Sequence, residues 1–232
     1  MIETSPTDLT GALEQLLSER WSCRAYLPEP VPHDQITRVL QLAQRAASWC
    51  NTQPWQVIVT EGAGTERFRA ALSVHAAREG GRLKPDIPMP DKYTGVHLER
   101  RRESGWQLYQ AVGITRGDRE ASARQAFKNF ELFGAPHCAI ITVDASQGAY
   151  GALDTGLFVA NFLLAAQSLG LGAIPQAALA TYAPFVREFF DIPADRAVLL
   201  GISFGRPDRD HPANGYRTRR ADLEQVVQWC TA

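Results

Sequence analysis

The sequence predicts an α+β domain, and three apolar segments carry that prediction. Residues 138–143 and 197–204 are rich in β-branched and other apolar side chains, a composition typical of buried strands. Residues 153–169 are apolar on nearly every side, so we expect a central and largely buried helix there. Neither an internal repeat nor a low-complexity linker divides the 232 residues, and we expect one domain over residues 1–232.

The other elements follow from helical spacing, chain breakers and strand-like runs. Leucines at positions 9, 13, 16 and 17 share one helical stripe, with Ser5, Thr7 or Asp8 available as its cap. Closely spaced prolines then break the chain ahead of a second amphipathic stripe at 36–43. The remaining predicted elements are strands at 55–60 and 172–175, helices at 66–78, 97–112 and 119–133, and a helix opening near Pro184.

Composition and charge argue against several classes of partner. The 24 basic and 25 acidic side chains give a formal charge of −1, whereas a nucleic-acid-binding protein needs a basic face. No apolar run approaches the roughly 18 residues of a membrane span, so we expect no membrane partner. Residues 1–6 contain neither a charged leader nor an apolar core, and we expect a cytoplasmic location.

The cysteines are scattered, and no two of them form a CxxC pair. With only five histidines beside Cys23, Cys50, Cys138 and Cys230, no cluster has the spacing of a zinc site. We therefore expect no metal and four reduced thiols.

A possible nucleophile motif occurs near the end of the chain. Residues 201–205 read Gly-Ile-Ser-Phe-Gly, which matches the G-x-S-x-G string of serine hydrolases. That motif requires a helix directly after the serine, but Ser203 lies inside an apolar run that Arg206-Pro207 follows. A buried strand serine is therefore the favoured interpretation, and a serine esterase is the alternative.

Three polar sets indicate ligand binding more directly. Arg20 and Arg24 bracket Ser22 at a helix end, an arrangement suited to a phosphate and a second anionic or carbonyl group. The loop at 48–55 places small polar donors beside tryptophans ahead of a strand, which suits a planar polar ring. A late basic group contains Arg217, Arg219 and Arg220.

Taken together, these sets resemble the nitroreductase family of flavin mononucleotide (FMN) enzymes over nearly the whole chain. The fragments that carry the resemblance are Arg20-x-Ser22-x-Arg24, Ser48-x-x-Asn51-x-Gln53-Pro54-Trp55, Phe133-Gly134-Ala135-Pro136, Leu169 to Gly172 running into Pro175-Gln176-Ala177, and Gly205-Arg206-Pro207. Trp49-Cys50 and the tail at 211–214 look most like the nitrobenzoate reductase branch.

The resemblance implies a set of cofactor-binding residues. Arg20 and Ser22 would hold the FMN phosphate, Arg24 would lie near ring N1 and O2, and Arg220, with Arg219 beside it, would grip the phosphate. The backbone of Pro175, Gln176 and Ala177 would face the ring, with the Ala177 N–H toward N5. The full implied set also contains Trp21, Ser48, Asn51 and Gln53, while Trp49 and Cys50 are candidates to line the acceptor pocket.

The family also implies an architecture and a reaction. We expect a central, mainly antiparallel sheet flanked by helices in a domain-entwined homodimer, so that Ser48 and Asn51 reach the partner's flavin. Residues 80–118 would form an excursion over the active site and residues 206–232 a C-terminal extension. NADH or NADPH would reduce the flavin, which passes electrons to a nitroaromatic or quinone in a ping-pong cycle, with no side-chain acid or base as catalyst.

The same resemblance leaves other reactions open. Reductive dehalogenation, enone reduction and flavin fragmentation occur among similar proteins, and a flavin-binding module without turnover is a further alternative.

Overall fold

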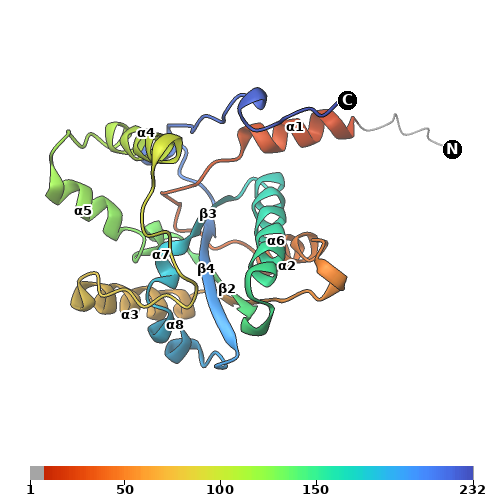
Figure 1. The fold of residues 1–232 in the computed structure, drawn as a ribbon. Coiled ribbons are helices and arrows are strands. Elements are labelled where there is room, and N and C mark those ends of the chain that lie inside the picture. Colours follow the sequence, from red (N-terminus) through yellow and green to blue (C-terminus); the bar gives the residue numbers. More distant parts are fainter. Residues whose placement is uncertain (1–7, 232) are drawn as a thin grey trace.

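A four-stranded sheet forms the centre of the computed structural model, which describes residues 8–231 (Figure 1). Its strands are β1 (Trp55–Thr60), β2 (His137–Asp144), β3 (Gly172–Gln176) and β4 (Arg196–Gly205). Their order is β1-β2-β4-β3, and each neighbouring pair is antiparallel. The predicted α+β class and the antiparallel sheet are confirmed, and each predicted strand agrees with the observed one to within a residue or two.

Helices cover both faces of the sheet, which explains why β2 is apolar without alternation. Ala139 and Ile141 pack into one core with α2 (His33–Ala43) and α6 (Gly148–Ser168). Cys138 and Ile140 point the other way, into a second core with α3 (Ala63–Glu79), α7 (Ala177–Ala180) and α8 (Ala183–Phe190). Successive strand residues face opposite sides, so two buried faces require a continuous apolar run.

Three further helices contribute no fully buried side chain to either core, although Phe127 of the third packs against the second core. They are α1 (Leu9–Glu19), α4 (Gly95–Ala111) and α5 (Arg119–Phe127), and Figure 1 shows α1 and α4 beyond one end of the sheet. Asp8 caps α1 by accepting a hydrogen bond from the Gly11 N–H at 2.9 Å, whereas the other predicted caps, Ser5 and Thr7, lie outside the described residues.

Two predicted helix boundaries were wrong. The helix expected at 119–133 ends at Phe127, and it could not extend to residue 133 because Leu132 and Phe133 have φ of 54° and 52°, a left-handed conformation that a helix excludes. The central helix begins at Gly148 rather than at residue 153. Glycine disfavours helix, but at Gly151 it permits close packing, since a Cβ there would lie 3.0 Å from Val143 Cγ2.

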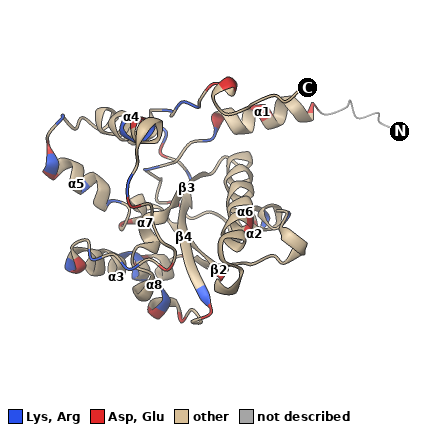
Figure 2. Ribbon diagram, in the orientation of Figure 1, with Lys and Arg blue, Asp and Glu red and all other residues tan. Residues whose placement is uncertain are grey.

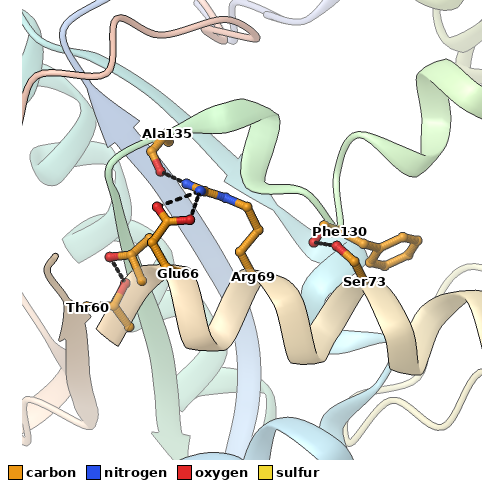
Figure 3. Close-up of polar contacts among 7 residues, drawn as sticks. Thr60, Glu66, Arg69, Ser73, Phe130 and Ala135 are labelled. Atoms are coloured by element: carbon orange, nitrogen blue, oxygen red, sulfur yellow. Dashed lines mark hydrogen bonds and ion pairs between the residues drawn. The ribbon is translucent and has the colours of Figure 1, made fainter. Parts of the chain in front are cut away.

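Polar contacts from α3 fix the segment between α5 and β2 (Figure 3). The Ser73 hydroxyl donates to the Phe130 carbonyl at 3.0 Å, and the Arg69 guanidinium donates to the Ala135 carbonyl. Arg69 also pairs with Glu66 at 2.6 Å. This segment is therefore held rigidly against the sheet, which matters because it carries Asn129 and Phe133 into the site described below.

The central helix is apolar enough to raise the question of a membrane span. Residues 145–168 satisfy the length and composition of a spanning helix, and 44% of the most apolar window is buried within the chain. A core helix of a folded domain has the same properties, so this stretch by itself assigns no membrane location.

We predict that truncating a side chain destabilises the protein strongly on the buried face of α3 and hardly at all on its exposed face. Leu72 is fully buried, so Leu72→Ala should lower the free energy of unfolding by about 2–5 kcal/mol. Val74 lies on the same helix with 69% of its surface exposed, and Val74→Ala should change stability by less than about 0.5 kcal/mol. Urea unfolding of both variants measures the difference, and equal destabilisation would contradict the packing described.

Candidate functional site

A cavity lined by arginines lies between the end of α1, α4 and the C-terminal tail. Its volume is about 420 Å³, and we call it the arginine pocket. Its lining includes Arg20, Trp21, Ser22, Arg24, Ser104, Tyr216, Arg217 and Arg220. None of the described residues lining it is acidic, so four guanidinium groups meet without a carboxylate to neutralise them.

The electrostatics of the arginine pocket favour an anion. Burial, and secondarily the charge of Arg220, lower the pKa of the Arg20 guanidinium. Figure 2 shows basic residues on the tail near α4 and on the segment that follows α1. A phosphate would relieve this repulsion and accept several charge-assisted hydrogen bonds.

Trp21 forms part of the wall of the arginine pocket. The Arg217 guanidinium lies 4.4 Å from the centroid of the Trp21 ring and the Arg209 guanidinium lies 5.3 Å from it, both within cation–π range. The buried indole Nε1 has no hydrogen-bond partner among the described residues. A buried donor without a partner is costly, so this N–H is available to a ligand in the pocket.

Asn214 joins the tail to the first polar set. Its Oδ1 accepts from the Arg24 N–H at 2.8 Å, and its Nδ2 donates to the carbonyls of Ala25 at 2.9 Å and Asp208 at 2.7 Å. Only 3% of Asn214 is exposed. This amide therefore fixes the Arg24 backbone against a tail that is 190 residues distant in sequence.

The first polar set also lies beside the sheet. Ser22 forms an isolated parallel bridge with Ala173 of β3, and the Cys23 N–H donates to the Ala173 carbonyl at 3.2 Å. A Cβ at Gly172 would lie 2.7 Å from Cys23 Sγ, so this close approach requires glycine. The sheet thus sets the position of Ser22 and of its two flanking arginines.

A second cavity of about 300 Å³ lies where β3 passes into α7, and we call it the turn pocket. Pro175, Gln176 and Ala177 line it, as the resemblance implied that they would line a ring site. Its other lining residues include Arg24, Leu108, Tyr109, Gln125, Asn129 and Phe133. Because Arg24 lines both cavities, the two pockets are neighbours.

Ser203 supports the wall of the turn pocket from behind. It lies in β4, is completely buried, and its hydroxyl donates to Gln176 Oε1 at 2.5 Å. Gln176 Nε2 in turn donates to the Asn129 carbonyl at 3.0 Å. The strand interpretation of Ser203 is confirmed, because a buried serine followed by no helix lacks the exposure of a hydrolase nucleophile.

The loop that carries Ser48, Asn51 and Gln53 lies apart from both pockets. The Trp49 N–H donates to Oδ2 of the buried Asp154 on α6 at 2.9 Å, and Ser48 Oγ accepts from the Gln53 N–H at 3.0 Å. Trp49 and Cys50 line a small cavity with Tyr150, whose ring centroid lies 4.6 Å from that of Trp49. This loop therefore packs on α6, not beside the arginines of its own chain.

The backbone of this loop is strained. Cys50, Asn51 and Gln53 have φ of 52°, 55° and 48°, in the left-handed region that residues other than glycine rarely adopt. Such conformations cluster where a binding or catalytic geometry must be held. The strained backbone makes this loop a candidate functional element, although it lies apart from the arginine pocket of its own chain.

The structure thus brings together part of the predicted set. Arg20, Trp21, Ser22, Arg24 and Arg220 line the arginine pocket, and Pro175 to Ala177 line the turn pocket. Arg219 lines a different cavity, where its guanidinium is 3.9 Å from Glu103.

The sequence reasoning missed several residues that line or support the pockets. They are Asn214, Tyr216, Tyr109, Gln125 and Asn129. Local signals were limited to the basic group beside Tyr216 and the tail at 211–214, which ends in Asn214. No group of three His, Cys, Asp or Glu within residues 8–231 has a geometry that would hold a metal ion.

Comparison with known sequences identifies the relatives of this chain. The model of the Nitroreductase family matches residues 17–206. Nitroreductase NfnB of Mycolicibacterium smegmatis is 36% identical over 230 residues, which cover 98% of this chain and 97% of that protein. The 4-nitrobenzoate reductase of Pseudomonas putida is 30% identical, with 91% and 92% covered.

Comparison with solved structures gives the same relatives. The crystal structure of the FMN-dependent nitroreductase NfnB from Mycobacterium smegmatis, in complex with NADPH, superposes with a TM-score of 0.91 at 35% identity, covering 97% of this chain and all of that one. The FMN- and NADPH-dependent NfnB from sphigopyxis sp. strain HMH gives 0.89 at 29% identity, with 95% and 99% covered. The overall fold is therefore that of these enzymes.

We predict that Ser203 acts through structure alone. Ser203→Ala leaves the buried Gln176 Oε1 unpaired, which should lower the free energy of unfolding by about 1–3 kcal/mol. Hydrolysis of p-nitrophenyl acetate should remain at the background level in both wild type and variant. Measurable hydrolysis that the substitution abolishes would restore the esterase alternative.

Proposed function

Because the chain belongs to the nitroreductase family, we propose that it is an FMN-dependent oxidoreductase that uses NADPH or NADH to reduce nitroaromatic compounds. Its relatives include an FMN-dependent nitroreductase crystallised with NADPH and a 4-nitrobenzoate reductase. Quinones are proposed as further acceptors.

One observation carries the proposal: the arginine pocket and the turn pocket share Arg24. FMN has a phosphate at one end and a planar ring at the other. The acid-free set of guanidinium groups suits the phosphate, and the unpartnered Trp21 N–H adds a neutral donor there. The smaller cavity, walled by backbone, a tyrosine and amide side chains, suits the ring. The hydrogen-bond donors that line the two pockets therefore fit FMN.

Each residue then has a distinct task. Arg20, Ser22 and Arg220 would hold the phosphate, with Arg217 joining them, and Arg24 would lie between the phosphate and the ring. A guanidinium near N1 stabilises the negative charge that the reduced ring carries. The backbone of Pro175 to Ala177, buttressed by Gln176 and Ser203, would face the ring.

The chemistry requires no acid or base from the protein. Bound FMN would take two electrons and a proton, as hydride, from NADPH and pass two electrons to the acceptor. For a nitroarene the first cycle balances as ArNO₂ + NADPH + H⁺ giving ArNO, NADP⁺ and water. A second NADPH and proton convert the nitroso compound to the hydroxylamine. Solvent supplies the protons. The protein positions the cofactor and the acceptor, stabilises charge on the reduced ring and excludes competing reactions.

A homodimer is the second part of the proposal. The chain exposes 14381 Å², whereas a compact monomer of its 25.6 kDa would expose about 10,400 Å². Obligate dimers bury roughly 2,000–5,000 Å² in total at their interface, so a partner chain is a physical means of covering such an excess. Large apolar side chains are exposed on one side of α1, on one side of α6 and along the tail: Leu9, Leu13, Leu17, Tyr150, Leu153, Leu157, Leu223, Val226 and Trp229.

The dimer would complete the site. The strained loop of Cys50 and Asn51 packs on α6 beside exposed Tyr150, so an interface through α6 would carry this loop to the partner. Ser48 and Asn51 would then reach the partner's ring, with Trp49 and Cys50 at the acceptor. We also propose that residues 80–118 form an excursion over the site, through Ser104 and Tyr109, and that residues 206–232 extend a single domain.

We predict that purified protein carries close to one FMN per chain and that two arginines retain it. Each charge-assisted contact contributes roughly 1.5–3 kcal/mol, so the variant Arg20→Ala with Arg24→Ala should raise the Kd for FMN more than a hundredfold. Flavin fluorescence titration measures the change. Arg38→Ala with Arg78→Ala, two exposed arginines on α2 and α3, serves as the control and should bind normally. A colourless protein that does not bind added FMN would refute the proposal.

We predict a dimer that depends on the exposed face of α6. Sedimentation equilibrium should give twice the 25.6 kDa chain mass. Leu153 is 60% exposed in the single chain, and Leu153→Glu should shift the protein to monomer because it buries a charge in the interface. Val74→Glu, at a site 69% exposed on α3, should remain dimeric. A monomeric wild type would contradict the interface.

Steady-state kinetics should distinguish the reactions open to this fold. With NADPH and 4-nitrobenzoate varied together, double-reciprocal plots should be parallel, because both substrates use the same flavin face in turn. We expect turnover of the nitroarene and of a quinone, and none of a halogenated phenol. Converging lines would exclude the ping-pong cycle, and flavin that NAD(P)H fails to bleach would favour a binding module.

A further inference from the structure

Asp154, in the interior of α6, is a buried carboxylate without a cation. Only 5% of its surface is exposed, and no Lys, Arg or His within residues 8–231 forms an ion pair with it. Taking a carboxylate out of water without a cationic partner costs free energy, and aspartate is also a poor helix former. Folding stability therefore does not explain why an aspartate occupies this position.

The partner of Asp154 is a backbone group of the loop at residues 48–53. Its Oδ2 accepts from the Trp49 N–H at 2.9 Å, and a hydrogen bond to a carboxylate is about twice as strong as one between neutral groups. The Trp49 side chain is itself 61% exposed. The loop is thus held here through its main chain and not by burial of the indole.

The other side-chain hydrogen bonds that reach this loop from outside are exposed. The Thr52 hydroxyl donates to Gln147 Oε1 at 3.0 Å, and Gln44 Nε2 donates to Gln53 Oε1 at 3.0 Å. Water competes for groups in such positions, so these bonds fix the loop weakly. Among the described residues, Asp154 therefore supplies the buried polar contact of the loop.

The loop needs an external contact because its main chain is strained. Cys50, Asn51 and Gln53 have positive φ, and such a conformation persists only where the surroundings hold it. Asp154 holds the residue directly before this strained stretch, and it lines the small cavity of about 270 Å³ that Trp49 and Cys50 also line. One carboxylate therefore sits behind both of the side chains that we assign to the acceptor.

We propose that Asp154 is a positioning residue for the reduction of the acceptor: its carboxylate fixes the Trp49 backbone and thereby the loop that lines the acceptor site. The proposal rests on the proposed function, since it takes this loop as a wall of that site. Asp154 acts through the loop and exchanges no proton with the acceptor. An oxygen at the position of Oδ2 is what the loop requires, and an asparagine can supply it.

The first test compares two substitutions of Asp154 in the FMN-loaded enzyme. Asp154→Leu removes the acceptor of the Trp49 N–H, so the KM for 4-nitrobenzoate should rise about tenfold while kcat stays within about twofold. Asp154→Asn keeps an oxygen for this N–H, and its KM should stay within about threefold of wild type. Thr155→Val is the matched control, because its buried hydroxyl bonds only within α6, to the Gly151 carbonyl, and it should change neither constant.

Two outcomes of this test would overturn the proposal. If the leucine and asparagine variants have equal KM values, the hydrogen bond to Trp49 does not position the acceptor. If Asp154→Leu fails to fold, or unfolds at lower urea with its KM unchanged, the aspartate serves folding instead.

The second test follows the loop without turnover, by amide hydrogen exchange and mass spectrometry. The peptide that contains residues 48–53 should exchange about tenfold faster in Asp154→Leu than in wild type and should stay protected in Asp154→Asn, while peptides from α3 should not change. Unchanged exchange in the loop of the leucine variant would overturn the proposal even in an active enzyme. A wild type whose loop is protected in this way but which reduces no nitroarene would instead overturn the proposed function, and with it the link to the acceptor.

Discussion

The side chain of Asn214 is the contact on which the candidate site depends. Its amide accepts from the Arg24 N–H and donates to the carbonyls of Ala25 and Asp208, so three segments of backbone are fixed by one buried group. It ties the tail that carries Arg217 and Arg220 to the segment that carries Arg24, which the sheet positions through Ser22. The guanidinium groups of the arginine pocket repel one another. The hydrogen-bonded framework supplies the free energy that holds them together in the absence of an anion.

The arrangement divides the work between rigid and exposed parts of the chain. The sheet places Ser22 through its bridge to Ala173, and the buried Ser203–Gln176 pair holds the turn between β3 and α7. The remaining wall comes from helices outside the two cores, α4 and α5, and from the tail. Residues that fix position are therefore buried in the sheet layers, whereas the other residues that line the two pockets lie on elements with fewer core contacts.

Much of the fold was predictable because its signals are local. The strands at 138–143 and 197–204 are recognisable from side-chain type alone, and both lie in the centre of the sheet. The helix boundaries at Phe127 and Gly148 were not predictable from local signals. The left-handed conformation of Leu132 and Phe133 and the tight packing of Gly151 on Val143 both depend on tertiary contacts. At such points tertiary packing outweighs intrinsic helix propensity.

The same distinction applies to the site. Arg20, Ser22 and Arg24 could be found from their spacing, and Pro175 to Ala177 from family resemblance. Asn214 lies in the tail at 211–214 that carries part of the resemblance, but its role could not be predicted, since an asparagine in a polar stretch indicates nothing until its buried partners are seen. Arg219 and Arg220 illustrate the limit: Arg220 lines the arginine pocket as well as the neighbouring cavity at α4, whereas the adjacent Arg219 lines only the second of these two, a difference that the path of the tail determines.

The backbone of the loop at Cys50, Asn51 and Gln53 restricts how this protein can evolve or be engineered. Three left-handed residues in four positions admit glycine, asparagine and aspartate readily but penalise valine, isoleucine and threonine. Diversification of the small cavity beside this loop is therefore restricted to Trp49 and to Tyr150 on α6, where side-chain size can change without altering the path of the main chain.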